Sequence, residues 1–156
     1  MRKICLIITL SVLGFSSCDS NKIFDASKDI ENNQWNRHEK ISYGIDIKDT
    51  ITPMNLFINF RHADFFPYSD VYFFLKTTFP DGTILNDTIK HTLQEDGQWK
   101  GDGAGNIWDN VILFNTFQFP KKGNYAFEIE QASRDSILPG VMAVGLRIEK
   151  CEKVVK

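Results

Sequence analysis

The residues that could hold a phosphate group or a calcium ion gather in one short stretch of this sequence. Gly101-Asp102-Gly103-Ala104-Gly105 has the composition of a phosphate-binding loop. Such a loop presents its ligand to the N-terminus of a following helix, whereas alternating β sequence follows here, so we do not expect nucleotide binding. Asp96, Asp102 and Asn106 could supply oxygens to calcium, but their spacing matches no EF-hand loop. We therefore predict a solvated loop over residues 95–106, with a calcium- or glycan-binding loop as the alternative.

Histidine and cysteine residues show no spacing typical of a metal site or a catalytic centre. His62, Asp64 and Asp70 lie near one another along the chain, but no His-Glu-x-x-His pattern includes them, so we expect surface polar residues. Cys151 stands in a C-terminal tail, and the sequence contains no Gly-x-Ser-x-Gly motif for a nucleophilic serine. We predict that the protein is not an enzyme and that it uses no metal, cofactor or small-molecule substrate.

Charged and aromatic side chains near the ends of predicted strands form a more informative set. Arginine and tyrosine are favoured anchors in protein interfaces, so these side chains could form a contact surface for a partner protein. A structural alternative stays open, in which the arginines pair with nearby carboxylates and the aromatic rings cap the ends of a sandwich. The candidate contact residues are Arg61, Phe66, Tyr68, Gln131, Arg134 and Arg147.

Period-two alternation of apolar and polar residues must supply the strands that position these side chains. We predict extended segments over residues 43–48, 54–61, 71–78, 83–93, 107–119, 124–131 and 142–149. The segment 83–93 is either a strand pair or one bent strand, and we expect 107–119 to break near Asp109-Asn110. Apolar residues occupy both faces of 71–78, which indicates a strand covered on both sides or lying near an interface.

Turn signals separate these segments. Phe79-Pro80-Asp81-Gly82 is typical of a turn, because proline fixes φ and glycine accepts positive φ. Pro67 makes residues 62–69 an irregular corner, and we expect one helical turn before Pro139. The spacing predicts an all-β fold, a single antiparallel β-sandwich of about eight or nine strands, immunoglobulin-like or jelly-roll-like.

The first 18 residues resemble a bacterial lipoprotein signal peptide. Arg2 and Lys3 precede an apolar run over residues 4–15, and Ser16-Ser17 lead into Cys18. The run is too short to cross the hydrocarbon core of a bilayer, which needs about 20 residues. We predict that Cys18 becomes the lipidated first residue of the mature chain. The alternative is an ordinary cleaved signal with a chance cysteine.

Cleavage before Cys18 removes 17 of the 156 residues and leaves 139, with 16 basic and 20 acidic side chains once Arg2 and Lys3 are gone. This size suits one domain, and a formal charge of −4 argues against a nucleic-acid-binding surface. We expect a signal peptide over residues 1–17, a lipidated N-terminus and tether over 18–33 with a short edge strand at 22–26, a β-sandwich domain over 34–150, and a flexible tail over 151–156.

Short motifs spread from the signal to about Glu149 together resemble one protein family. The motifs are Asn59-Phe60-Arg61-His62, Phe66-Pro67-Tyr68 with Asp70 and Val71, Asp87-Thr88-Ile89, Gly97-x-Trp99-x-Gly101-x-Gly103, Phe119-Pro120-x-x-Gly123-x-Tyr125-x-Phe127, Glu130-Gln131-Ala132-x-Arg134, Leu138-x-Gly140 and Val144-Gly145-Leu146-Arg147-Ile148-Glu149. With the cysteine signature at Cys18, the chain resembles GldH, the gliding-motility lipoprotein family of Bacteroidetes. It departs from the family pattern at Phe66, where tyrosine is common, and at Ser133, where methionine is common.

The resemblance implies a lipid-anchored envelope protein that is required for gliding motility and linked to the type IX secretion machinery. It would act by binding or stabilising other envelope proteins of that machinery, and no catalytic residue comes with the family. The family also occurs in members of the phylum that do not glide. The anchor would lie in the cell membrane or the outer membrane. Surface display in this phylum follows an acidic run after the lipidated cysteine, and residues 19–23 hold one acid, so we expect the domain to face the periplasm.

Overall fold

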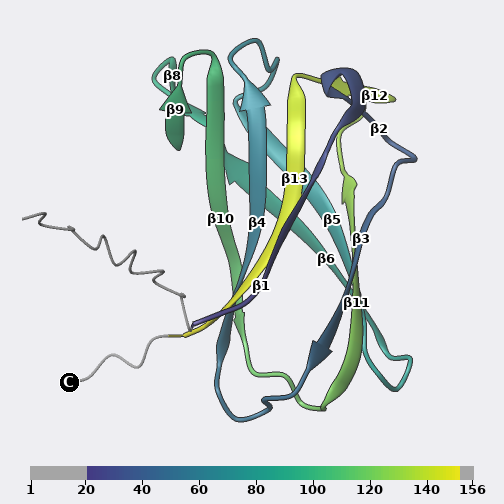
Figure 1. The fold of residues 1–156 in the computed structure, drawn as a ribbon. Coiled ribbons are helices and arrows are strands. Elements are labelled where there is room, and N and C mark those ends of the chain that lie inside the picture. The colour runs from purple at the N-terminus through teal and green to yellow at the C-terminus, as the bar shows by residue number, and fades with distance from the viewer. Residues whose placement is uncertain (1–20, 152–156) are drawn as a thin grey trace, which may run out of the picture.

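Two antiparallel β-sheets packed face to face make up the computed structural model of the chain, which describes residues 21–151 (Figure 1). The five-stranded sheet contains, in spatial order, β1 (Lys22–Asp29), β13 (Val141–Lys150), β4 (Met54–Ala63), β10 (Ile107–Phe117) and β9 (Asp102–Ala104). The four-stranded sheet contains β3 (Ile41–Ile47), β11 (Gly123–Gln131), β5 (Asp70–Thr78) and β6 (Ile84–Thr92). The predicted all-β sandwich is confirmed, and its two sheets hold nine strands.

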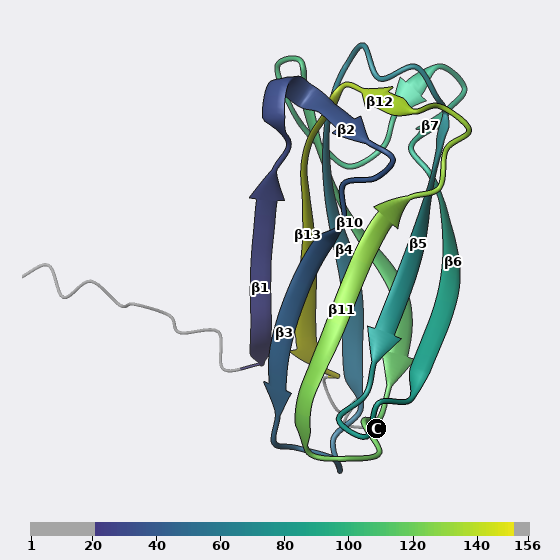
Figure 2. The ribbon, with the colours of Figure 1, turned by 90° about the vertical axis from the view of Figure 1, so that its right-hand side faces the viewer.

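Short elements cover one end of the sandwich, which we call the upper end (Figures 1 and 2). They are the 3₁₀ turn η1 (Glu31–Asn33), the ribbon of β2 (Gln34–Asn36) with β12 (Ile137–Pro139), and the hairpin of β7 (Gln94–Glu95) with β8 (Gln98–Trp99). The opposite, lower end carries the turns over residues 48–53, 79–83 and 118–122. Within residues 21–151, no helix is long and apolar enough to span a bilayer.

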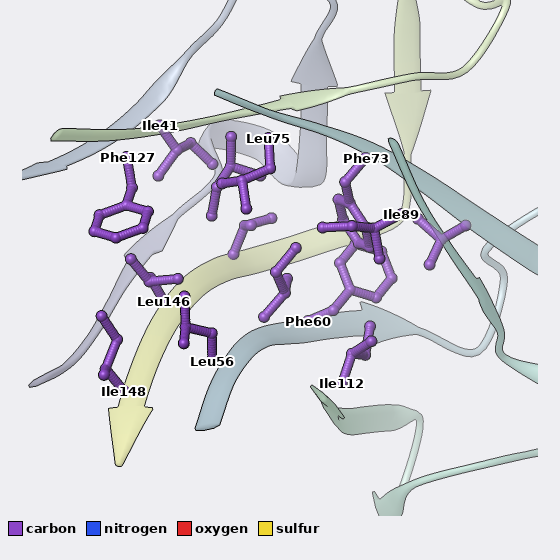
Figure 3. Packing of buried hydrophobic residues seen from close by; sticks show 14 of the residues in the cluster. Ile41, Leu56, Phe60, Phe73, Leu75, Ile89, Ile112, Phe127, Leu146 and Ile148 are labelled. Atoms are coloured by element: carbon purple, nitrogen blue, oxygen red, sulfur yellow. The ribbon is translucent and has the colours of Figure 1, made fainter. Parts of the chain in front are cut away.

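The core lies between the two sheets, where the alternating side chains of facing strands meet (Figure 3). Phe127 and Leu75 of the four-stranded sheet point toward Leu146 and Phe60 of the five-stranded sheet, and none of these four is more than 1% exposed. Period-two alternation in β11, β5, β4 and β13 therefore turns one face of each strand inward, as the sequence pattern predicted.

The sandwich begins earlier in the chain than the sequence indicated. An edge strand was expected over residues 22–26, whereas β1 pairs with β13 from Lys22 to Asp29. The next residue, Ile30, is buried. Most β1 side chains face solvent at the sheet edge, so backbone pairing holds the strand and no apolar alternation marks its length. Residues 22–30, which we placed in the tether, thus lie in the sandwich.

Three local expectations were wrong or incomplete. β10 is continuous through Asp109-Asn110, where Asn110 is buried, and its register against β4 shifts only between Leu113 and Asn115. The residues before Pro139 form strand β12 in place of a helical turn. Residues 95–106, predicted to be a solvated loop, are mostly exposed, and they contain the short strands β8 and β9 and the end of β7, joined by turns. The segment 83–93 is one strand, β6.

Candidate functional site

A groove of about 520 Å³ opens at the upper end of the sandwich. One wall comes from the corner that leads into β5, with Tyr68, Asp70 and Tyr72, and the other from the connection between β11 and β12, with Arg134 and Asp135. Because these walls are far apart in the sequence, the groove exists only when β5 and β11 pair side by side. The backbone N–H of Ala132 continues that pairing by donating to the carbonyl of Tyr72 at 2.9 Å.

The connection that carries Arg134 is held by a set of short-range hydrogen bonds. Gln131 is 2% exposed, accepts from the backbone N–H of Ser133 at 2.9 Å, and donates to the carbonyl of Asp135 at 3.1 Å. The Ser133 hydroxyl accepts from the backbone N–H of Asp135. Arg37, which follows β2, donates to the carbonyls of Ser133 and Arg134. The position of the Arg134 backbone is therefore fixed before any partner arrives.

Arg134 carries the unpaired charge of this groove. Its side chain is exposed and makes no hydrogen bond or ion pair with any residue that the structure describes. It also borders a second hollow, of about 560 Å³, beside Arg37, His38 and Phe74. An unpaired guanidinium presents a planar fork of donors, which suits a carboxylate or phosphate group.

The carboxylates of the groove already have partners. Thr92 donates to Asp70 at 2.7 Å and Lys90 pairs with it at 3.1 Å, and these contacts lower the pKa of Asp70. The Tyr68 hydroxyl donates to Asp135, and this hydrogen bond raises the pKa of Tyr68. Tyr68 is a neutral donor and leaves Asp135 ionised, so Arg134 is a cation without an ion-pair partner among residues 21–151, beside two carboxylates that other side chains engage.

Two further contact candidates are built into the groove as supports. Phe66 is 4% exposed and packs edge-on against Phe60, with ring centroids 5.7 Å apart, and its ring also meets Tyr68. Gln131 is buried below the connection, as described above. Both side chains are almost fully buried, Phe66 at the floor of the groove and Gln131 beside the second hollow, and their contacts support the groove.

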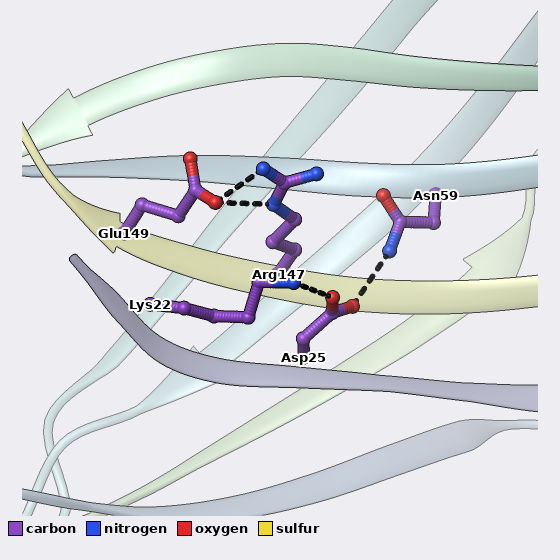
Figure 4. A network of polar contacts seen from close by, with 5 residues as sticks. All are labelled: Lys22, Asp25, Asn59, Arg147 and Glu149. Carbon is purple, nitrogen blue, oxygen red and sulfur yellow. Dashed lines mark hydrogen bonds and ion pairs between the residues drawn. The ribbon is translucent and has the colours of Figure 1, made fainter. Parts of the chain in front are cut away.

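The remaining two candidates lie on the outer face of the five-stranded sheet, away from the groove. Arg61 forms a two-point contact with Asp109, at 2.7 and 3.1 Å. Arg147 pairs with Glu149 (Figure 4). Its guanidinium also lies 5.6 Å from the centre of the Phe57 ring. These two arginines thus follow the structural alternative, because each has a carboxylate partner within the chain.

Some exposed apolar residues of the upper end were not among the candidates. Tyr72 and Phe74 project from the outer face of β5 with 41% and 50% of their surface exposed, and Phe65 of the corner is 64% exposed. The signal was present in the sequence, because apolar residues occupy both faces of 71–78. Strand alternation alone did not decide whether the second face would be covered.

His62 is a buried residue, which corrects the expectation of a surface polar side chain. It is 0% exposed and packs against Trp99 and Phe66, with ring centroids 4.7 and 5.3 Å away. Burial lowers its pKa, although the contact of Nδ1 with the Ala63 carbonyl opposes the shift. Among residues 21–151, no three His, Cys, Asp or Glu side chains converge as metal ligands would. Cys18, the predicted lipidation site, lies outside the described residues.

Comparison with known proteins gives a consistent set of relatives. A family model described as GldH lipoprotein matches residues 22–148. A gliding motility lipoprotein GldH homolog from Christiangramia forsetii is 29% identical over 155 residues, which cover 94% of each chain. Gliding motility lipoprotein GldH from Flavobacterium johnsoniae is 26% identical over 152 residues, which cover 92% of this chain and 94% of the relative.

Among solved structures, a chain of infectious bursal disease virus strain Gx aligns with 97% of this chain and 39% of its own length. Its TM-score of 0.34 and identity of 14% are too low to support an argument about fold or function.

Proposed function

This chain belongs to the GldH lipoprotein family, and from that premise we propose that it binds a partner protein of the gliding and type IX secretion machinery through the upper-end groove. The role is non-enzymatic and consists of holding or stabilising the partner. Arg134 supports this proposal most directly, because it is an exposed guanidinium without a partner among residues 21–151, on a connection that internal hydrogen bonds hold in place. Prior ordering of a contact residue lowers the entropy cost of binding.

The chemistry of the groove suggests what it would recognise in the partner. Tyr68 and Tyr72 offer flat apolar surface with a polar tip, and Arg134 offers the unpaired positive charge. A partner segment that carries a carboxylate next to an apolar side chain would satisfy both features. Interfaces often centre on such tyrosine and arginine anchors, which contribute a large share of the binding energy.

The anchor and its orientation belong to the same proposal. Cys18 carries the lipid, and the sandwich faces the periplasm, because residues 19–23 hold a single acid. Protease added to sealed whole cells should therefore leave the domain intact and degrade it only after the outer membrane is permeabilised. Degradation in sealed cells would contradict the periplasmic orientation.

Site-specific photo-cross-linking in living cells tests the groove directly. Tyr72 is replaced by a photoreactive phenylalanine analogue, and the matched control places the same analogue at Leu113, which is 55% exposed on the outer face of the five-stranded sheet. We expect a defined adduct with one envelope protein from position 72 and none from position 113. Equal adducts from both positions, or an adduct from 113 alone, would show that the groove is not the contact surface.

A further inference from the structure

The lower end of the sandwich lies close to the point where the lipid would be attached. β1 begins at Lys22, four residues after Cys18. A fully extended chain spans at most about 3.6 Å per residue, so the Cα atoms of Cys18 and Lys22 are at most ~14 Å apart. This inference rests on the proposed acylation of Cys18. With acyl chains on that cysteine, the beginning of β1 cannot leave the immediate neighbourhood of the bilayer.

Hydrogen bonds join the beginning of β1 to the loops of the lower end. The backbone N–H of Lys150 donates to the carbonyl of Asn21, and that of the next residue, Cys151, donates to the carbonyl of Pro53, both at 2.8 Å. The side chain of Gln118 in turn donates to the carbonyl of Thr50 at 3.0 Å. The 48–53 loop therefore lies directly beside the tethered strand, and the 118–122 turn is linked to that loop.

Ile51 is held at the tip of the 48–53 loop, and 83% of its surface is exposed. The carboxylate of Asp49 accepts from the backbone N–H groups of Ile51 and Thr52 at 2.9 and 3.0 Å, and these bonds lower the pKa of Asp49 to about 2. A single exposed isoleucine is common on protein surfaces. This one stands out because of its place on a loop that is braced at the tethered end of the molecule.

Lysine residues occur on the loops of the lower end, Lys48 at the start of the 48–53 loop and Lys122 at the end of the 118–122 turn. Lys122 makes no ion pair within residues 21–151, and the nearest carboxylate to Lys48 is that of Asp46 at 3.8 Å. The nearby acids are engaged, since Asp49 binds backbone N–H groups and Asp81 pairs with Lys121. An exposed apolar tip on an end that also carries Lys122 and the loosely paired Lys48 matches the boundary between acyl chains and lipid phosphates.

We propose that the lower end of the sandwich docks on the bilayer surface, with Ile51 inserted among the headgroups and Lys48 and Lys122 against lipid phosphates. The upper-end groove then points away from the membrane. β4, with ten residues at about 3.3 Å each, separates the two ends by roughly 33 Å. The lipid therefore sets the orientation in which the groove is presented as well as the location of the domain.

Fluorescence quenching by lipid-attached nitroxide tests the docking in the full acylated chain. Single labelling sites are made by Ile51→Cys or Phe65→Cys in a Cys151→Ser background, and the chain is reconstituted in phosphatidylcholine vesicles. Ile51 lies at the lower end, whereas Phe65, 64% exposed in the corner at the upper end, is the matched control. We expect a roughly twofold or greater loss of fluorescence from a label at 51 and none at 65, because interfacial apolar groups penetrate about 5–10 Å.

Vesicle flotation separates failure of docking from failure of anchoring. The acylated chain should float with the vesicles and the Cys18→Ala chain should remain in the dense fraction. If the acylated chain floats but the label at 51 is quenched no more than the label at 65, the docking inference is overturned and the anchor stands. If the acylated chain does not float, anchoring and docking are both overturned, whereas binding through the groove is judged separately by the cross-linking at position 72.

Discussion

Tyr68 and Asp135 meet across the upper-end groove, where the phenolic hydroxyl of Tyr68 donates a hydrogen bond to a carboxylate oxygen 67 residues further along the chain. The bond joins the corner before β5 to the connection that carries Arg134. It also holds the Asp135 carboxylate against Tyr68, on the connection next to Arg134. The geometry of the groove therefore depends on a contact between two loops that only the paired sheet brings together.

Replacing Tyr68 with phenylalanine should weaken partner capture while leaving the fold intact. Tyr68→Phe keeps the ring and removes the hydrogen bond to Asp135, so the connection loses one brace and Asp135 is released toward Arg134. Because both side chains lie at the surface, the midpoint of thermal unfolding should hardly change. Asp135→Asn keeps an acceptor oxygen and should behave more like the unaltered chain. Unchanged capture by Tyr68→Phe would show that this bond does not shape the binding surface.

Gly145→Ala should destabilise the edge of the five-stranded sheet. A Cβ at this position would lie 2.6 Å from the carbonyl oxygen of Ala26 and 2.2 Å from the Ser27 hydroxyl, both on β1. The hydroxyl can rotate away, but the backbone of β1 can move only by disturbing its pairing with β13, so we expect a loss of about 1–3 kcal/mol in the free energy of unfolding.

Gly44→Ala is the matched control, because nothing lies within 4 Å of a Cβ built on that strand glycine. This change should be neutral or stabilising by roughly 0.5 kcal/mol. Urea unfolding of the two variants, together with hydrogen exchange of the β1 amides, provides the comparison. Equal stabilities would show that β1 accommodates the extra carbon without loss.

Phe127→Ala should cost about 3–5 kcal/mol, because it removes a fully buried ring from between the sheets and leaves a cavity. Against a total stability of roughly 5–15 kcal/mol, the variant should be largely cleared from the envelope. Phe74→Ala on the neighbouring strand removes the same side chain from an exposed position and should cost less than about 1 kcal/mol. Denaturant unfolding and steady-state abundance should both show a larger loss for Phe127→Ala than for Phe74→Ala. Similar losses would show that something other than residues 21–151 covers Phe74.

The protein should lose stability as the pH falls below about 6.5, in part because of His62. Burial lowers the pKa of His62 in the fold, so below the ordinary histidine pKa of about 6.5 the unfolded chain binds a proton that the native chain does not. Below pH 6.5, one such group lowers the free energy of unfolding by up to about 1.4 kcal/mol for each pH unit of acidification. Above pH 6.5 the same group causes no pH dependence. His62→Phe should flatten this slope whatever its stability at pH 7.5.

Urea unfolding at pH 7.5 and 5.5 measures this effect. The pKa of His91 is also lowered by burial, so part of the slope should remain in the His62 variant. Asp49 and Asp81 have lowered pKa values, and their contributions are lost only at more acidic pH. An unchanged slope in His62→Phe would assign the pH dependence to other groups.

The sequence predicted the parts of the fold that depend on local alternation. Tyr125, Phe127 and Ile129 recur at every second position, and all three are buried on one face of β11. β1 was underestimated, because an edge strand with solvent-facing side chains needs only backbone partners. His62 continues the inward positions Met54, Leu56, Ile58 and Phe60 of β4, so extending the alternation past Arg61 would have placed it in the core. It was expected at the surface because its ring is polar, whereas Trp99 of β8 and Phe66 of the corner cover that ring.

The candidate site was predicted only in part, because pairing across strands decides which polar groups remain available. Arg61 and Arg134 look alike in sequence, each at the end of an alternating segment. In the structure, the register of β4 against β10 places Asp109 opposite Arg61, whereas the residues around Arg134 bind one another. Strand register cannot be read from a local sequence pattern. The sequence therefore identified both arginines as candidates but could not show that Arg61 has a carboxylate partner and Arg134 has none among residues 21–151.

Affinity capture from native envelopes with tagged Arg134→Ala and Arg61→Ala chains tests the proposed binding groove most directly. Both changes remove an exposed arginine, and Arg134→Ala should alter the free energy of unfolding by less than about 1 kcal/mol. We predict that Arg134→Ala retains the fold but captures the partner at least roughly tenfold more weakly, as expected for an anchor residue, whereas Arg61→Ala captures it normally. Normal capture by Arg134→Ala, or an equal loss in both variants, would contradict binding through the groove.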